Sequence, residues 1–145
     1  MRDRRRVALA DLPLIISAGA VVVVIRLALW TIPSRILLRK VDGMVARAPV
    51  PAGGTPAVRR IGWAVRGVSR YVPRASCLTQ ALATQILLAR RGYSSRLRLG
   101  VLNHPRDGFA AHAWVEIEGE ILVGGHGAQR YRILPELSPH LRNDR

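Results

Sequence analysis

Cys77 is the only cysteine in the chain, and its position could support nucleophilic chemistry. Apolar residues recur three and four positions apart after Ser76, which predicts a helix over residues 76–92. The hydroxyl of Ser76 can accept a backbone N–H of the first turn and cap this helix. We therefore expect Cys77 at the first helical position, where the positive end of the helix dipole favours a thiolate.

His112 is the histidine best placed to act on that thiol. It lies in the middle of residues 109–117, whose pattern predicts a strand, and a strand beside the helix N-terminus could hold the imidazole against the thiol. The other histidines fall in a turn, a glycine-rich corner and the tail, at His104, His126 and His140. From the residues alone, a buried structural cysteine and a core histidine remain the alternative.

The elements that must position this pair follow from the periodicity. The predicted helix carries one apolar stripe and ends at Arg90, Arg91 and Gly92, which suit a helix C-terminus. The stripe is Leu78, Ala81, Leu82, Ile86 and Ala89. The pattern then alternates, which predicts strands at 97–101, 109–117 and 120–123, with a two-residue hairpin turn at 118–119 and a short last strand at 131–134.

The N-terminal half is predicted to be helical. Residues 12–25 form an apolar run that ends at Arg26, too short for a typical membrane span, so a buried or interfacial helix fits best and membrane insertion is the alternative. Residues 34–47 predict an amphipathic helix, and the proline- and glycine-rich residues 48–56 a linker. Residues 57–72 predict a third helix, which Pro73 ends. Its solvent-facing side carries Arg59, Arg66 and Arg70.

The chain is strongly basic, with a net charge of +14 that is almost entirely arginine, since Lys40 is the only lysine. This charge favours acidic partners such as a peptide, a protein, a nucleic acid or an anionic membrane. Nucleic acid is disfavoured because few residues are aromatic and none alternate with basic residues as a base-stacking surface would require. No Cys/His cluster has zinc-ligand spacing and no glycine-rich phosphate loop is present, so we expect no metal and no cofactor.

The segment from 73 to 125 resembles the leader peptidases of lasso peptide biosynthesis, which are transglutaminase-like cysteine proteases. The matching pattern is C-L-x-x-A-L-A from Cys77, then R-R-G, then L-x-x-G-V, then A-H-A-W-V-E-x-x-G around His112. The combination is specific, whereas each piece alone would be weak. The resemblance implies that Cys77 is the nucleophile and His112 the base.

The resemblance also implies a fold and partners. We expect an α+β fold with a papain- or transglutaminase-like core over residues 57–145, preceded by N-terminal helices and a linker over residues 1–56. The implied substrate is a ribosomally made precursor peptide, cut between leader and core in the cytoplasm. Because no leader-binding domain is evident, the chain resembles the separate protease half, which acts with a leader-binding protein. The lasso cyclase is a further candidate partner, and the apolar run a candidate for peripheral membrane contact.

One position departs from the family pattern. The family often carries an Asp in the strand after the A-H-A-W strand, to orient the histidine, and that position falls at Gly124. No nearby carboxylate replaces it well: Asp107, Glu116, Glu118 and Glu120 are each too distant or not fixed in place. We therefore expect a backbone carbonyl or a water around Gly124 and Gly125 to orient His112. Gln80, one turn after Cys77, is a possible oxyanion helper beside the Cys77 N–H.

Two other functions stay open. A non-enzymatic, basic, membrane-apposed binding module would use Cys77 only as a structural residue. An acyltransferase on the same scaffold would share the Cys77–His112 pair but pass the acyl group to an amine.

Overall fold

The computed structural model describes residues 7–48, 50–51, 55–106 and 108–134 of the chain. Residues 1–6, the tail with His140, and Asp107 lie outside the described residues. The helices are η1 (Leu9–Asp11), α1 (Leu12–Thr31), α2 (Ser34–Ala46), α3 (Pro56–Ser69), α4 (Cys77–Arg90) and η2 (Ala128–Arg130). The strands are β1 (Val50–Pro51), β2 (Tyr93–Ser94), β3 (Arg96–His104), β4 (Gly108–Ile117), β5 (Glu120–Val123) and β6 (Arg132–Ile133).

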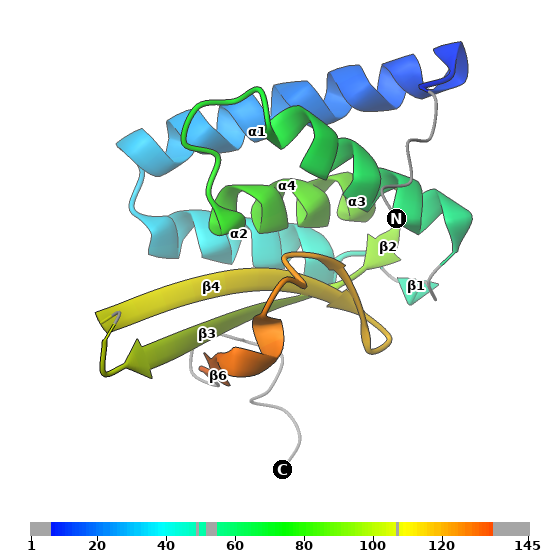
Figure 1. The fold of residues 1–145 in the computed structure, drawn as a ribbon. Coiled ribbons are helices and arrows are strands. Elements are labelled where there is room, and N and C mark those ends of the chain that lie inside the picture. Colours follow the sequence, from blue (N-terminus) through cyan, green and yellow to red (C-terminus); the bar gives the residue numbers. More distant parts are fainter. Residues whose placement is uncertain (1–6, 49, 52–54, 107, 135–145) are drawn as a thin grey trace.

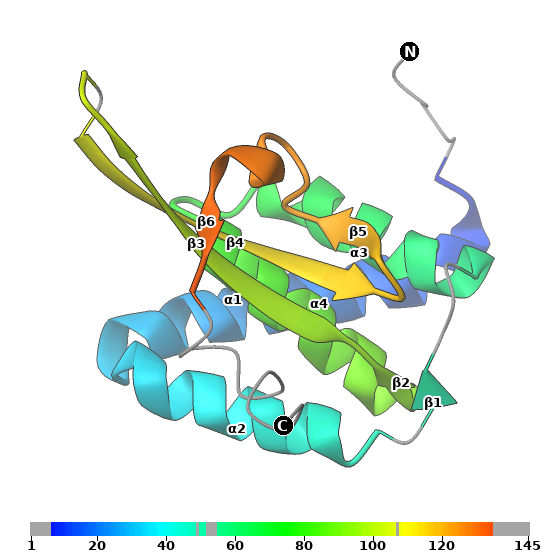
Figure 2. The same ribbon diagram turned by 90° about the horizontal axis from the view of Figure 1, so that it is seen from below.

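The strands form a four-stranded antiparallel sheet in the order β5-β4-β3-β6, and β1 and β2 form a separate parallel pair. The helices α1 to α4 lie on one side of the four-stranded sheet, and η2 lies on its other side, from which the chain enters the edge strand β6 (Figures 1 and 2). The predicted α+β class, with N-terminal helices before the sheet, is confirmed.

Helix α4 lies at the centre of this arrangement, between the other helices and the sheet (Figure 1). The sequence predicted one apolar stripe, but the structure also buries the residues between its members, among them Thr79, Thr84 and Gln85. The buried surface of α4 is wider than the predicted stripe, because other elements pack against the helix on several sides. The hydroxyl of Thr84 is satisfied locally, since it donates to the Gln80 carbonyl at 2.8 Å.

Helix α1 contributes one face to the main core and leaves the opposite face exposed. Ala18 and Val22 are fully buried and belong to the same cluster as Val58 of α3 and Leu88 of α4. An ion pair between Asp11 and Arg60 joins the start of α1 to α3. Residues on both sides of the predicted domain boundary after residue 56 therefore share one core. The boundary itself stays a prediction.

Helix α3 ends at Ser69, three residues earlier than predicted. The peptide N–H groups of Tyr71 and Ala75 donate to carbonyls three residues back, and Arg74 has a φ of 58°, so the chain turns toward α4 instead of continuing the helix. A proline also disfavours helical geometry at the residue before it, which is Val72 here. This explains why the helix ends before Val72 and Pro73.

The β4–β5 hairpin has the predicted two-residue turn. Glu118 and Gly119 have φ angles of 46° and 83°, and positive φ at both central residues is the geometry of the type I′ turn that suits a twisted hairpin. The guanidinium of Arg66 in α3 donates to the carbonyl of Leu122 in β5 and ties the hairpin to the helical layer. Partial burial lowers the pKa of Arg66, and the charge of Arg70 nearby lowers it further.

Candidate active site

Cys77 is the first residue of α4, as the sequence predicted. The N-cap residue Ser76 has extended backbone geometry, and its hydroxyl accepts the N–H of Thr79 at 3.3 Å. Thr79 Oγ1 lies 3.1 Å from the same hydroxyl, so the first turn is held by two contacts. Cys77 carries a free, half-buried thiol that packs against the main hydrophobic cluster. The thiol is thus fixed in position at the start of a buried helix.

His112 projects from the face of β4 that turns away from the helices. Successive side chains of a strand point to opposite faces, so Ala113 and Val115 lie on the face opposite to His112. Both belong to the hydrophobic cluster that includes residues of α3 and α4. The ring of His112 lies instead between two aromatic rings, with centroid distances of 6.0 Å to Trp114 and 5.0 Å to Tyr131. His112 is half-buried.

The His112 ring is held by a backbone carbonyl. Its Nε2 lies 2.6 Å from the carbonyl oxygen of Gly124, a contact of the kind that the sequence analysis expected. A carbonyl oxygen can only accept, so Nε2 must carry the hydrogen and donate it. In the neutral ring this leaves Nδ1 as the nitrogen with a free lone pair, able to accept a proton.

Glycine at position 124 is required by the backbone and by the lack of space. Its φ is 80°, a conformation that residues with a side chain rarely adopt. A Cβ there would lie 2.5 Å from the Ala113 carbonyl oxygen and 2.9 Å from Trp114 Cβ. The Asp of the family pattern would therefore clash at this position with the backbone of β4. Gly124 contributes its backbone carbonyl to His112, and a side chain at this position would have to displace backbone atoms of Ala113 and Trp114.

The carboxylates near the site have other partners. Glu116 accepts from Trp114 Nε1 at 2.8 Å with one oxygen and pairs with Arg98 at 3.1 Å with the other. Glu120 pairs with Arg59 at 3.1 Å, and Glu118 is exposed at the hairpin turn. Among the described residues, no hydrogen bond or ion pair joins a carboxylate to His112.

The structure does not join the two predicted catalytic residues by a hydrogen bond. Within the part of the chain that is described, no hydrogen bond links Cys77 to His112 or to Gln80, which is half-buried one turn along α4. The roles of Cys77, His112 and Gln80 therefore remain predictions. The other described histidines are exposed, with His104 Nδ1 accepting the N–H of Arg106 at 3.3 Å and His126 in the glycine-rich corner.

Two residues of the His112 environment were missed by sequence reasoning. Tyr131 reaches the ring because β6 pairs with β3, where Ile133 lies opposite Gly100. Gly100 also lies opposite His112, and a Cβ there would meet Tyr131 Cβ at 2.7 Å and the Trp114 ring at 2.9 Å. Only a glycine leaves space for both rings. The sequence signal for Gly100 is a glycine inside a strand pattern, which marks a close approach, whereas Tyr131 has no local signal.

The described residues hold no group of three or more His, Cys, Asp or Glu side chains that could bind a metal ion. A family model described as the transglutaminase-like superfamily matches residues 19–136, from within α1 to just past β6. No curated protein and no solved structure matches the chain.

The fit around Gly124 yields a stability prediction. Replacing Gly124 with Ala adds both the strain of a positive φ and an overlap with backbone, so we expect a loss of about 2–5 kcal/mol in the free energy of unfolding. Gly127 is the matched control, because its φ is 73° but a Cβ there has nothing within 4 Å. Gly127→Ala should cost only the strain, about 1–2 kcal/mol. Urea unfolding of both variants measures the difference, and equal losses would contradict the steric account.

Proposed function

The chain belongs to the transglutaminase-like superfamily, and from this premise we propose that it is a cysteine peptidase with Cys77 as nucleophile and His112 as general base. The observation that carries the proposal is the position of the only cysteine, at the start of the capped, buried helix α4 and inside the matched region. A helix N-terminus stabilises negative charge, as a thiolate nucleophile requires.

The proposed reaction assigns each proton. His112 Nδ1 takes the thiol proton, and the thiolate attacks the scissile carbonyl carbon to form a tetrahedral oxyanion. The backbone N–H of Cys77, which has no acceptor within its helix, can donate to that oxyanion. Collapse breaks the peptide bond, and the leaving amine takes the proton from the imidazolium. Water then attacks the thioester while His112 Nδ1 takes its proton, and the departing Cys77 thiolate takes that proton back. Gly124 keeps the donating Nε2–H in place during each transfer.

This mechanism requires Cys77 and His112 to approach each other when substrate binds. Catalytic hydrogen bonds are often long or absent without substrate and tighten only in the reacting complex. His112 lies on the face of β4 that turns away from α4, so the approach must pass around the edge of β4, where β5 pairs with that strand only from Val115 to Ile117. On the β5 side, the described part of the sheet places no strand beside β4 at His112.

We further propose that the substrate is a lasso-type precursor peptide, cleaved between leader and core in the cytoplasm. The support for this finer assignment is the local pattern C-L-x-x-A-L-A, R-R-G and A-H-A-W-V-E, which resembles the leader peptidases of that pathway. An acyltransferase would use the same pair of residues, and the mass of the product distinguishes the two reactions, because hydrolysis adds water and transfer adds an amine.

Replacing Cys77 with Ser tests the nucleophile. The change is small and serine is tolerated at a helix start, so the fold should persist, while cleavage of a candidate precursor should fall by at least about a thousandfold. Mass spectrometry of the products measures cleavage, and circular dichroism checks the fold. Cys77→Ala provides a second variant without any nucleophile. Turnover by folded Cys77→Ser at the rate of the natural chain would refute the cysteine peptidase.

A leader-binding partner should raise the cleavage rate. A partner that holds the leader can raise the local concentration of the scissile bond toward the millimolar range. Exposed basic residues on α2 and directly after α3, including Arg35, Arg39 and Arg70, could attract acidic residues of the partner or the leader. We expect faster cleavage with the partner at micromolar precursor, and a smaller gain as salt screens the charges. Equal rates with and without the partner would contradict this proposal.

A further inference from the structure

Helix α1 exposes a continuous apolar stripe on the side opposite its packed face. The packed face is formed by Ala18, Val22 and Ile25. The exposed residues follow one another at intervals of three and four, so they share one side of the helix. The stripe consists of Leu12, Ile16, Ala20, Val23, Leu27 and Trp30. Such a row of large apolar side chains in water is unusual for a soluble surface and marks an interaction site.

The stripe suits contact along a membrane surface. Within the described residues, one helix, from Leu9 to Thr31, is long and apolar enough to cross a membrane by length and composition. However, Val22 and Ile25 pack into the core, so α1 in this fold presents only one side to lipid. A helix with one side packed on a folded domain and the other apolar lies in the plane of the interface.

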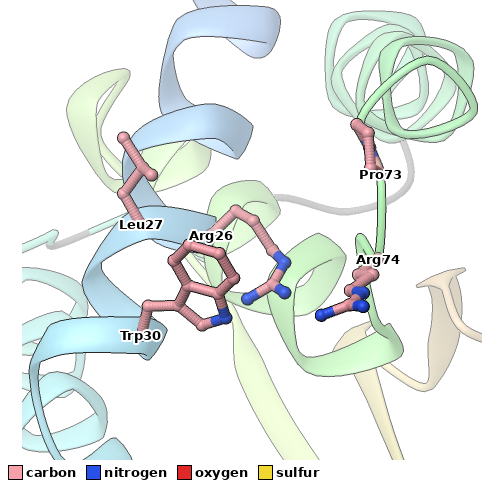
Figure 3. Close-up of a pocket in the computed structure, with 5 residues that line it drawn as sticks. All are labelled: Arg26, Leu27, Trp30, Pro73 and Arg74. Atoms are coloured by element: carbon pink, nitrogen blue, oxygen red, sulfur yellow. The ribbon is translucent and has the colours of Figure 1, made fainter.

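A pocket of about 310 Å³ lies at the C-terminal end of the stripe and shares two of its residues, Leu27 and Trp30. Its other lining residues are Arg26, Pro73 and Arg74, the last two from the loop between α3 and α4 (Figure 3). The pocket therefore has apolar walls that continue into the stripe and two guanidinium groups. It contains no acidic lining residue.

The two arginines are set up to receive an anion. The guanidinium of Arg26 lies over the Trp30 ring, with Cζ 5.3 Å from the ring centroid, and its Nε is buried without a hydrogen-bond partner. The close-up shows both guanidinium groups turned toward the same space (Figure 3). Two like charges around one pocket repel each other, and an anion between them would remove that repulsion and satisfy the buried Nε.

Arg74 is held at this pocket in a strained backbone conformation. Its φ of 58° is a left-handed conformation that non-glycine residues adopt rarely and with strain. Strained residues of this kind cluster at ligand-binding sites. A guanidinium matches the geometry of a phosphate, to which it can donate two parallel hydrogen bonds.

We propose that α1 lies in the surface of an anionic membrane, with the phosphate of a phospholipid head group held between Arg26 and Arg74. The apolar stripe is then buried among the acyl chains next to the head group. Trp30, 70% exposed at the pocket, and Tyr71, 88% exposed in the loop beside it, take the interfacial positions that aromatic residues favour. The net charge of +14 attracts the whole chain to the same surface.

Vesicle sedimentation of the full chain tests this proposal. We expect binding to vesicles of phosphatidylcholine mixed with phosphatidylglycerol, and little binding to phosphatidylcholine alone. The double variant Arg26→Gln and Arg74→Gln should weaken binding by about tenfold or more. Val23→Gln with Leu27→Gln, both at exposed positions, should also weaken it without unfolding the chain.

The control is the double variant Arg90→Gln and Arg91→Gln, which removes the same charge from exposed residues at the other end of α4. That end is about 20 Å from the loop, beyond the screening length, so this variant should change binding by no more than about threefold. If both double variants lose vesicle binding equally, the binding depends on nonspecific charge attraction rather than on the pocket, and the proposal is overturned. Absence of vesicle binding would overturn it as well, as would capture of an acidic peptide in place of vesicles.

Discussion

Burial of α4 is the constraint on which the rest of the structure depends. Its residues contact α1, α2 and α3 on one side and the sheet on the other, and Leu82 and Leu88 are completely buried. A helix buried on several sides has little freedom to rotate or slide, because nearly every shift would open a cavity in the core. For comparison, the cavity left when a buried leucine is truncated to alanine lowers the free energy of unfolding by about 2–5 kcal/mol. Cys77 is held in place by this packing, and the Ser76 cap fixes the first turn of α4, in which Cys77 lies.

The residues that surround His112 lie on the side of the sheet opposite to helix α4. Glycines at two positions allow close approaches there: Gly100 leaves space for Trp114 and Tyr131, and Gly124 brings its carbonyl to Nε2. A backbone carbonyl fixes the tautomer as a carboxylate would, but it carries no full charge and stabilises an imidazolium less. The proposed enzyme is therefore expected to be slower than a relative with an Asp, and its His112 to depend on backbone geometry rather than on another side chain.

Local patterns predicted the elements well, because caps and turns act over a few residues. Ser76, Gly92 and the Glu118–Gly119 turn all have the predicted geometry. The sequence failed where distant segments meet. The predicted apolar stripe of α4 did not include Thr79, Thr84 and Gln85, which tertiary packing also buries. Tyr131 reaches His112 through a strand pairing that no local pattern encodes. For the same reason, the spacing of Cys77 and His112 could suggest a pair without specifying which side of the sheet His112 faces.

The most direct test of the account is the rate at which iodoacetamide alkylates Cys77 across pH, in the natural chain and in His112→Ala. Cys77 is the only cysteine, so the label reports on this thiol alone. If His112 accepts the thiol proton, the natural chain should be labelled readily at mildly acidic pH and His112→Ala should lose that labelling. Identical profiles for the two proteins, both slow in acid and rising as an ordinary thiol ionises, would contradict an activated Cys77–His112 pair and favour a structural cysteine.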